Sequence, residues 1–353
     1  ALANIHELCP QAAASRGLVA LQLGASEERR RWPVAYFAQL ATRLAAEGYT
    51  PVLLGTQSER PLGERLKTLA PVALADLMGA TDLPSLAATL AGCALLVTND
   101  TGTMHLAAGL GVPSVSIFLA TAQPWDTGPY LPGCLCLEPD LAASTGDCHP
   151  CAFGQGCPHR QNGSEACRWA IRPEGVATLA LAMLTGSLPE SGAPLPCPGA
   201  RVWRTVIGAD GLMDLKSLSG HEEQDRTRLI RLQRRLYRRY LDGEEMEQTG
   251  DAPVGLSDPV AQALGKTLGE AADLLFLLSR QGELLARGPA QAAKGKFLAT
   301  WQRVRGVLGA EDRLAVLSAL WLFESERPGL DLAGIMALTA RFRQLLLALR
   351  NQL

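Results

Sequence analysis

The sequence lacks an excess of charge, a long apolar run and an export signal, and each absence excludes a class of protein. Its 33 Lys and Arg residues against 35 Asp and Glu residues leave a formal net charge of -2, so no global basic field draws it to nucleic acid. No apolar run approaches the roughly 20 residues of a membrane-spanning helix, and the start ALANIHELCP is unlike a signal peptide. We therefore expect a folded cytoplasmic protein with no nucleic-acid partner.

The first apolar run, LVALQL at residues 18–23, is followed by GASEERRRWP and lacks the G-x-G-x-x-G turn of a Rossmann dehydrogenase. From residue 18 onward, short apolar runs such as TPVLLG and ALLVTN alternate with amphipathic stretches. This pattern predicts strands buried between helices. The fold class expected is α/β, a Rossmann-like doubly wound parallel sheet with ligands at the carboxyl ends of its strands.

Changes of composition divide the chain into four parts. We expect a lead-in over residues 1–17, the α/β domain over residues 18–190 with a Cys-rich loop at 134–170, and a Pro/Gly/Ser-rich linker at 191–200. Residues 201–353 carry apolar side chains at helical spacing, which predicts an all-helical extension. Its segment RTRLIRLQRRLYRRY is basic, which is typical both of contact with anionic lipid or lipopolysaccharide phosphates and of an ordinary solvated helix.

The most informative motif is VTNDTGTMHLAAGLGVP, where an apolar strand ends at Asn99 and a helix begins at about Thr103. Free backbone N–H groups at a helix start favour a bound phosphate. Gly102 would let a diphosphate approach the backbone, Thr101 could donate a hydrogen bond, and His105 lies one turn into the helix. The motif therefore predicts an anion site.

A plain helix start would explain the same residues without any ligand. In that interpretation Asp100 caps the helix, Thr101 lies in a turn and His105 is a satisfied, partly buried side chain. D-T-G also occurs in aspartic proteases, where two copies face each other in an all-β fold. The D-T-G at residues 100–102 leads directly into a helix, so we exclude that class.

Two other strand ends are expected at the same edge of the sheet. Gly24, Ala25 and Ser26 follow the first strand, and Arg29, Arg30 and Arg31 bring guanidinium groups within reach of a phosphate, although such a run is also typical of a solvated helix start. Glu59 follows the strand PVLLG, a position from which a carboxylate accepts hydrogen bonds from a ribose.

Together these segments resemble the C-terminal half of glycosyltransferase family 9, the ADP-heptose:lipopolysaccharide heptosyltransferases. The similarity covers about residues 18–185 and is most specific in NDTGTMHLAAGLGVP. It implies an inverting, metal-independent enzyme of two-domain GT-B architecture that needs no cofactor for catalysis. Such enzymes transfer heptose from ADP-heptose to the lipopolysaccharide inner core at the inner face of the inner membrane.

The resemblance also implies roles for individual residues. Ser26 and Arg30 would contact the diphosphate, Glu59 the ribose and Thr81 the adenine. Arg30 stands where the family usually has lysine, so a planar fork replaces a point donor and puts the donor preference in doubt. The crevice for the diphosphate and the sugar would be lined by Asp100, Thr101, Gly102, Thr103 and His105. The general base belongs to the family's N-terminal half, so the catalytic residue is unknown and is expected outside this chain.

Four of the nine cysteines crowd into the segment CHPCAFGQGCPHRQNGSEAC. An odd number of cysteines in a long chain does not indicate a secreted disulfide framework. The opening C-x-x-C is typical of half a zinc knuckle, which predicts a structural zinc ion. The alternative is that the thiols pack as small hydrophobic side chains, with or without a disulfide. The four candidate ligands are Cys148, Cys151, Cys157 and Cys167.

The leading hypothesis is a glycosyltransferase to which this chain contributes the donor-binding half. Its expected partners are a nucleotide-diphosphate sugar, the lipopolysaccharide core or another glycan acceptor, an N-terminal half on another chain, and the membrane surface by peripheral contact. The alternative is a non-catalytic nucleotide-sugar-binding or scaffold protein.

Overall fold

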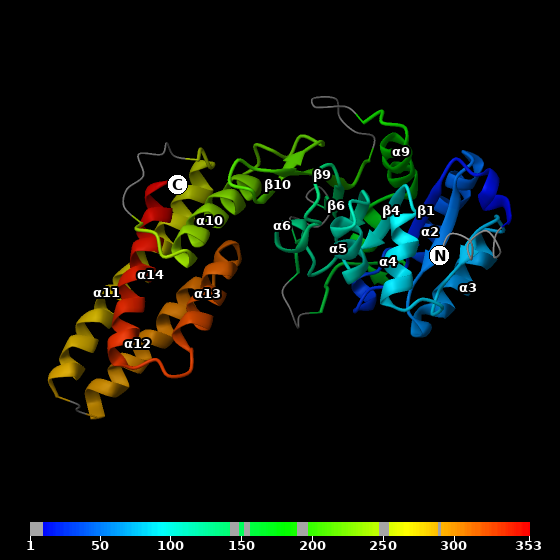
Figure 1. The fold of residues 1–353 in the computed structure, drawn as a ribbon. Helices are drawn as coiled ribbons and strands as arrows, with labels where there is room; N and C mark the ends of the chain where they lie inside the picture. Colours follow the sequence, from blue (N-terminus) through cyan, green and yellow to red (C-terminus); the bar gives the residue numbers. More distant parts are fainter. Residues whose placement is uncertain (1–9, 142–147, 152–155, 189–196, 247–253, 289–290) are drawn as a thin grey trace. The chain divides into compact units, whose positions relative to one another are not determined.

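The computed structural model describes residues 10–141, 148–151, 156–188, 197–246, 254–288 and 291–353. The chain divides into two compact units, residues 1–221 and 222–353. Each unit has its own hydrophobic core. Figure 1 shows the strands in the first unit and long helices in the second.

The first unit is built on an eight-stranded sheet of order β10-β9-β6-β5-β4-β1-β2-β3. The six strands β6, β5, β4, β1, β2 and β3 run parallel to one another. β9 is antiparallel to β6, and β10 is antiparallel to β9. This confirms the doubly wound α/β fold. The strands are β1 (Leu18–Gln22), β2 (Thr50–Leu54), β3 (Ala75–Asp76), β4 (Leu95–Asn99), β5 (Ser114–Ile117), β6 (Leu135–Pro139), β9 (Ala200–Ile207) and β10 (Met213–Ser217).

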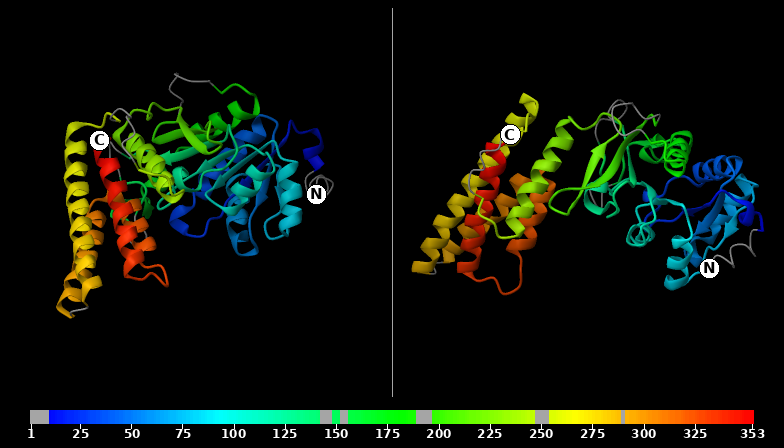
Figure 2. Two further views of the ribbon diagram at one scale, coloured as in Figure 1. Left: turned by 60° about the vertical axis from the view of Figure 1, so that its left-hand side comes forward. Right: turned by 45° about the horizontal axis from the view of Figure 1, so that its top comes forward.

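Helices cover both faces of this sheet (Figure 2). Val19 and Leu21 of β1 belong to the core under α2 and α9, whereas Leu18 and Ala20 belong to the core under α4 and α5. Because successive strand residues point to opposite faces, one apolar run serves both cores. The helices are α2 (Val34–Ala46), α3 (Arg60–Leu69), α4 (Leu83–Ala91), α5 (Gly102–Gly109), α6 (Pro124–Thr127), α8 (Cys167–Ala170) and α9 (Pro173–Leu184). Three 3₁₀ turns are η1 (Pro10–Ala14), η2 (Glu28–Arg30) and η3 (Gln57–Glu59). A separate short hairpin is formed by β7 (Arg160–Gln161) and β8 (Ser164–Glu165).

The boundary between the units lies later than the predicted linker at 191–200. Residues 200–207 form β9, which pairs with β6, so the expectation of helix from residue 201 was wrong. Val202 and Trp203 are fully buried, and these β-branched and aromatic side chains suit a strand. Most of the predicted linker lies outside the described residues, as does much of the lead-in, although Ala12 of η1 is buried.

The second unit, residues 222–353, is helical. In this part of the chain the predicted helical extension is confirmed. The apolar stripe of the basic segment, Leu229, Leu232, Leu236 and Tyr240, lies in its core. The elements are α10 (Asp225–Leu241), α11 (Asp258–Arg287), α12 (Gln291–Gly309), η4 (Asp312–Leu314), α13 (Ala315–Ser325) and α14 (Leu332–Asn351).

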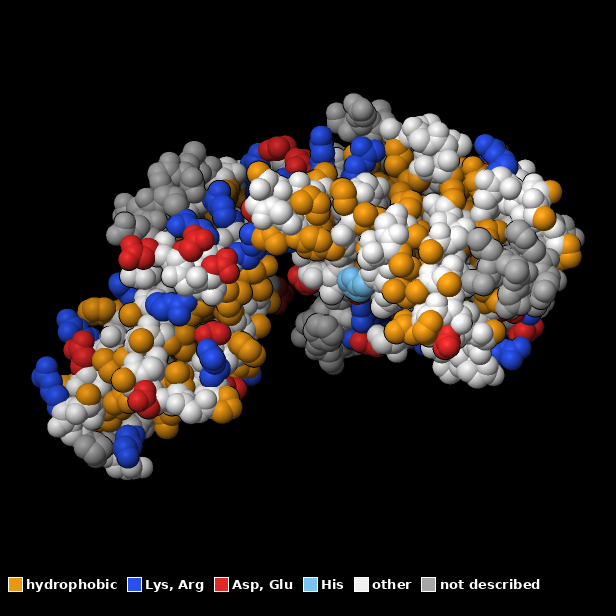
Figure 3. Space-filling model, in the orientation of Figure 1, with side chains coloured by type: hydrophobic (Ala, Val, Ile, Leu, Met, Phe, Trp, Pro, Cys, Tyr) orange, Lys and Arg blue, Asp and Glu red, His pale blue; other side chains and the backbone are white. Residues whose placement is uncertain are grey.

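The basic helix α10 does not present a field of unpaired charge. Each of its seven arginines takes part in an interaction; Arg231 pairs with Glu222 at 2.5 Å and Arg239 with Glu244 at 2.9 Å. Charges of both signs alternate with hydrophobic side chains on this unit in Figure 3. The ordinary interpretation of the segment, a helix packed on the bundle, is the one that these contacts favour.

Helix α14 is the one helix in the described residues that is long and apolar enough to cross a membrane by length and composition. From the sequence, no apolar run of this length was expected. Three arginines interrupt the apolar sequence of the helix, which is why the run was not recognised. Six of its side chains, including Phe342, Leu345, Leu346 and Leu349, are buried in the core of the helical unit. That packing accounts for the apolar side chains on the buried face of the helix.

Candidate functional site

Asn99 holds together two of the predicted binding loops. β1 and β4 are parallel neighbours, so the loops after both strands emerge at the same edge of the sheet. The fully buried Asn99 side chain donates to the carbonyl oxygens of Leu23 and Gly24, both at 3.0 Å, and accepts from the Trp32 amide at 2.9 Å. The sequence pattern predicted Asn99 only as the end of the strand. A polar residue at the end of an apolar strand could have indicated that its side chain makes buried hydrogen bonds.

Three predicted residues meet at this edge. The Arg30 guanidinium forms an ion pair with Asp100 and also donates to the Ser26 hydroxyl at 3.2 Å. Asp100 accepts a further hydrogen bond from Thr127 at 3.1 Å, a contact that the sequence did not suggest. The side chains of Arg30 and Asp100 are 19% and 7% exposed, respectively, so the pair is largely shielded from water.

One donor of this pair is unused. The Nε of Arg30 is buried and has no hydrogen-bond partner among the described residues. A buried N–H without an acceptor is costly. The position therefore favours an acceptor supplied from outside the protein.

The N-terminus of α5 is open. Its N-cap is Thr101, which makes no side-chain cap, so the interpretation of Asp100 as a helix cap was wrong. A Cβ at Gly102 would meet nothing within 4 Å, which leaves space beside the first backbone N–H groups. These groups and the helix dipole attract an anion.

The other predicted residues of this helix start have modest contacts. The Thr101 hydroxyl lies 3.2 Å from that of Thr98, and Thr103 donates to the Gln22 side chain at 3.3 Å. His105 is exposed and has no side-chain hydrogen bond in the described part of the chain, so it is not the satisfied, partly buried histidine of the ordinary interpretation.

Glu59 lies against the first binding loop. A Cβ added to Gly24 would come within 1.5 Å of the Glu59 Oε1 atom, so only glycine allows this approach. The other carboxylate oxygen accepts from the Thr56 amide at 2.8 Å and caps η3. Thr81 is half-buried and makes no side-chain hydrogen bond in the described part of the chain; the structure does not bring it into contact with the other predicted residues.

The four clustered cysteines lie close together but do not form a metal site as they stand. Burial raises the pKa of Cys167 to about 12, and the nearby charges of Cys151, Cys157 and Cys148 add to the effect. Burial likewise raises the pKa of Cys151, with Cys157 and Cys148 contributing. All four are free thiols, so the disulfide alternative is not observed for them.

Among the residues that the structure describes, no three His, Cys, Asp or Glu side chains are arranged to hold a metal ion. A zinc ion on these cysteines therefore remains a prediction, which metal analysis of the purified chain would check. The loop is nevertheless anchored to the sheet, because the Cys151 amide donates to the Ala120 carbonyl at 2.8 Å, just after β5.

A shielded arginine and an open helix start at the carboxyl edge of a doubly wound sheet are features typical of domains that bind phosphate-bearing ligands. Comparison with known families indicates which family this domain resembles. Residues 2–145 match the model of glycosyltransferase family 9 (heptosyltransferase). This part of the chain is similar to that family, in agreement with the resemblance drawn from its motifs.

Individual relatives agree with the family. The chain is 34% identical over 97 residues to lipooligosaccharide heptosyltransferase 2 of Haemophilus influenzae, which covers 26% of this chain and 28% of that protein. It is 37% identical over 93 residues to lipopolysaccharide heptosyltransferase 2 of Escherichia coli K12, covering 25% and 27%. The match therefore spans about a quarter of the length of these curated relatives.

Among solved structures, that of E. coli ADP-heptose LPS heptosyltransferase II has a TM-score of 0.41 and 25% identity, covering 49% of this chain and 48% of that one.

Proposed function

We propose that this chain supplies the donor-binding half of an inverting glycosyltransferase that transfers heptose from ADP-heptose to a lipopolysaccharide-type acceptor. The names of the relatives support the class of reaction. The observation that carries the donor assignment is the cluster of Arg30, Asp100 and Ser26 beside the open start of α5, where the buried Arg30 Nε has no partner among the residues that the structure describes.

These residues can bind a diphosphate and stabilise it as a leaving group. The free N–H of Arg30 and the first amides of α5 would donate to the phosphate oxygens. Asp100 holds the guanidinium in place, so little reorganisation is needed when the donor arrives. As the bond between sugar and phosphate breaks, negative charge develops on the diphosphate, and fixed positive groups stabilise this charge. A bound metal ion is not required for that role.

The nucleoside would lie over the neighbouring loops. Glu59, which packs against Gly24, retains an oxygen that can accept from ribose hydroxyls. Action at the inner face of the inner membrane forms part of this proposal, because the relatives' names refer to lipopolysaccharide and lipooligosaccharide.

Calorimetric titration with ADP, ADP-heptose, UDP-glucose and NADH tests the proposal. We expect the adenine diphosphates to bind, NADH and UDP-glucose to bind more weakly, and the double variant D100A/H105A to lose binding. Arg65→Gln, an exposed change on α3, is the matched control and should bind like the parent protein. If none of the four ligands binds, the donor site is refuted and the scaffold alternative gains.

A further inference from the structure

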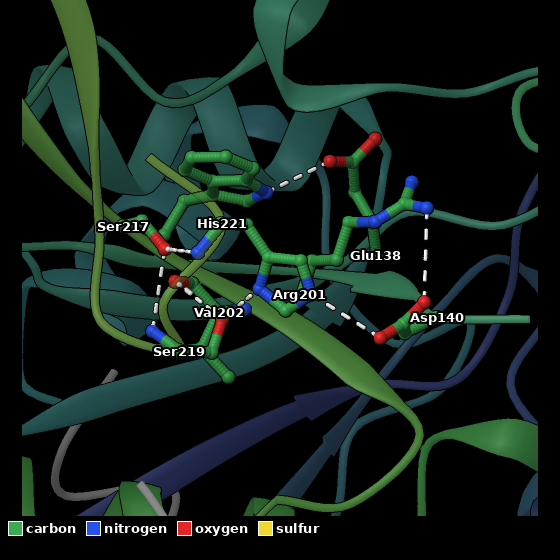
Figure 4. Close-up of polar contacts among 8 residues, drawn as sticks. Glu138, Asp140, Arg201, Val202, Ser217, Ser219 and His221 are labelled. Carbon is green, nitrogen blue, oxygen red and sulfur yellow. Dashed lines mark hydrogen bonds and ion pairs between the residues drawn. The ribbon is translucent and has the colours of Figure 1, made fainter. Parts of the chain in front are cut away.

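The first unit ends in a set of polar contacts, which Figure 4 shows. The His221 imidazole lies 2.8 Å from the Ser219 hydroxyl and 3.2 Å from the Asp140 carboxylate. Arg201 lies 3.7 Å from the other oxygen of Asp140. Because Asp140 directly follows β6, these contacts hold the end of the first unit on its sheet. Residues 222–353 form a unit with its own core and no role in the proposed function, so its own surface must indicate what it does.

Helix α13 of this second unit is apolar on two opposite faces. Its inner face carries Leu317 and Trp321, which are buried in the helical core. Its outer face carries Val316 and Phe323, whose exposed fractions are 45% and 70%, with the exposed Ala319 between them. A helix that is apolar all round is normally covered on every side. The outer face of α13 therefore indicates a contact surface.

The exposed apolar side chains of α13 form a continuous stripe. Val316, Ala319 and Phe323 follow one another at intervals of three and four residues, so they lie on one side of the helix. We call these three residues the outer stripe. Figure 3 shows hydrophobic side chains gathered on the helical unit where α13 lies in Figure 1. Exposed apolar patches on folded proteins mark sites of association.

Charges of opposite sign lie beyond the two ends of the outer stripe. Asp312 belongs to η4, just before α13, and Arg327 lies just after the end of α13. Both side chains are exposed, and neither has an ion pair or a hydrogen bond in the part of the chain that the structure describes. The neighbouring Arg313 is already paired with Glu311 at 2.6 Å. Asp312 and Arg327 are therefore available to a partner.

We propose that the outer stripe joins two copies of this chain, with α13 of one copy packed antiparallel on α13 of the other. A twofold axis midway between residues 319 and 320 places Val316 of each copy against Phe323 of the other. The same axis places Asp312 of each copy opposite Arg327 of the other, because both pairs of residues have the same midpoint. A single self-complementary surface of this kind gives a closed dimer.

The centre of the contact allows close packing. Ala319 lies beside the axis, and its small side chain lets the two helices approach each other. The contact spans about three helical turns, which is less than the surface that a permanent dimer buries. We therefore expect reversible association in the micromolar range. This inference is independent of the donor site.

Sedimentation velocity of the full chain, from about 1 to about 200 µM, tests the proposal. We expect the sedimentation coefficient to rise with concentration toward that of a dimer. Phe323→Glu places a charge in the outer stripe and should weaken the association at least about tenfold. Leu284→Glu, a matched change at a leucine of α11 that is 60% exposed, should leave it unchanged. Circular dichroism shows whether each variant is folded.

Exchange of the end charges tests the antiparallel arrangement. In a dimer of Asp312→Arg, two arginines face each other, and in a dimer of Arg327→Asp, two aspartates do. Each single variant should therefore associate more weakly than the parent protein. The double variant D312R/R327D restores opposite charges and should recover the association. A parallel pairing of the helices would not give this recovery.

Three results would overturn the inference. A monomer at every concentration would mean that another part of this chain, or a different partner, covers the outer stripe. A dimer that Phe323→Glu leaves intact would assign the contact to another surface. Failure of the double variant to recover the association of the parent protein would reject the antiparallel arrangement.

Discussion

At the scale of single residues, two glycines of the candidate site serve different ends. A Cβ at Gly24 would overlap the Glu59 carboxylate, so that side chain would have to move, whereas a Cβ at Gly102 would meet nothing within 4 Å. Gly24→Ala must push Glu59 out of its contact with the Thr56 amide. We expect it to lower the free energy of unfolding by about 1–2 kcal/mol, the usual worth of a cap.

Gly102→Ala provides the comparison. The new methyl group would fill the space beside the first amides of α5, so we expect unchanged stability and weaker ADP binding. Thermal unfolding and titration of both variants check the pair. Loss of stability in Gly102→Ala, or none in Gly24→Ala, would contradict this division of roles.

A buried thiol makes a separate prediction about pH. Burial raises the pKa of Cys197 from 9.0 to about 12, so the folded protein keeps a proton that the unfolded chain loses above pH 9. The stabilisation is present below pH 9 and is lost as the pH rises toward 12. Between pH 8 and pH 10, deprotonation of this thiol in the unfolded chain should lower the free energy of unfolding by about 1.4 kcal/mol.

Urea unfolding at both pH values under reducing conditions measures this loss. Cys197→Ala should show a decline that is smaller by about that amount. An identical decline in the two proteins would mean that the thiol is not shielded in the folded state.

At the scale of elements, β9 and β10 complete the sheet of the first unit. β9 pairs with β6 from Leu135 to Pro139, and the buried Trp203 packs against Trp125 with ring centroids 5.2 Å apart. A chain ended at residue 198 would expose the edge of β6 and lose that tryptophan. We expect it to aggregate or to lose at least about 3–5 kcal/mol of stability.

A chain ended at residue 221 keeps both strands. We expect it to unfold in one cooperative transition, monitored by circular dichroism. If the 198-residue chain folded as stably as the 221-residue chain, the two strands would not belong to the first unit.

Element type was predictable where the pattern was regular and local. The parallel strands β1 to β5 and the strand end at Asn99 followed from apolar runs between amphipathic stretches. β6 was missed, because its residues lie in the stretch 134–170 that was interpreted as a Cys-rich loop. β9 and β10 were missed because a Pro-rich stretch precedes them and long helical patterns follow. The pairing of β9 with β6 joins residues far apart in the sequence, which local periodicity does not reveal.

At the scale of the whole molecule, the sequence predicted that the candidate binding residues lie at one edge of the sheet, but not the contacts that they make. Ser26, Arg30 and Asp100 do meet, but sequence spacing could not show that Arg30 pairs with Asp100. It also could not show that Asn99 ties the two loops together, or that Thr127 completes the cluster. These contacts depend on how parallel strands bring separate loops to one edge.

In the proposed donor site, Arg30 binds the donor diphosphate while Asp100 positions the guanidinium group. Titration of ADP into the parent protein, Arg30→Lys and Arg30→Gln tests this assignment most directly. Lysine keeps the charge, so we expect affinity within a few-fold of the parent; glutamine removes it, and we expect affinity to fall by about 10- to 100-fold. Equal ADP affinity in all three proteins, with each shown to be folded, would contradict the account.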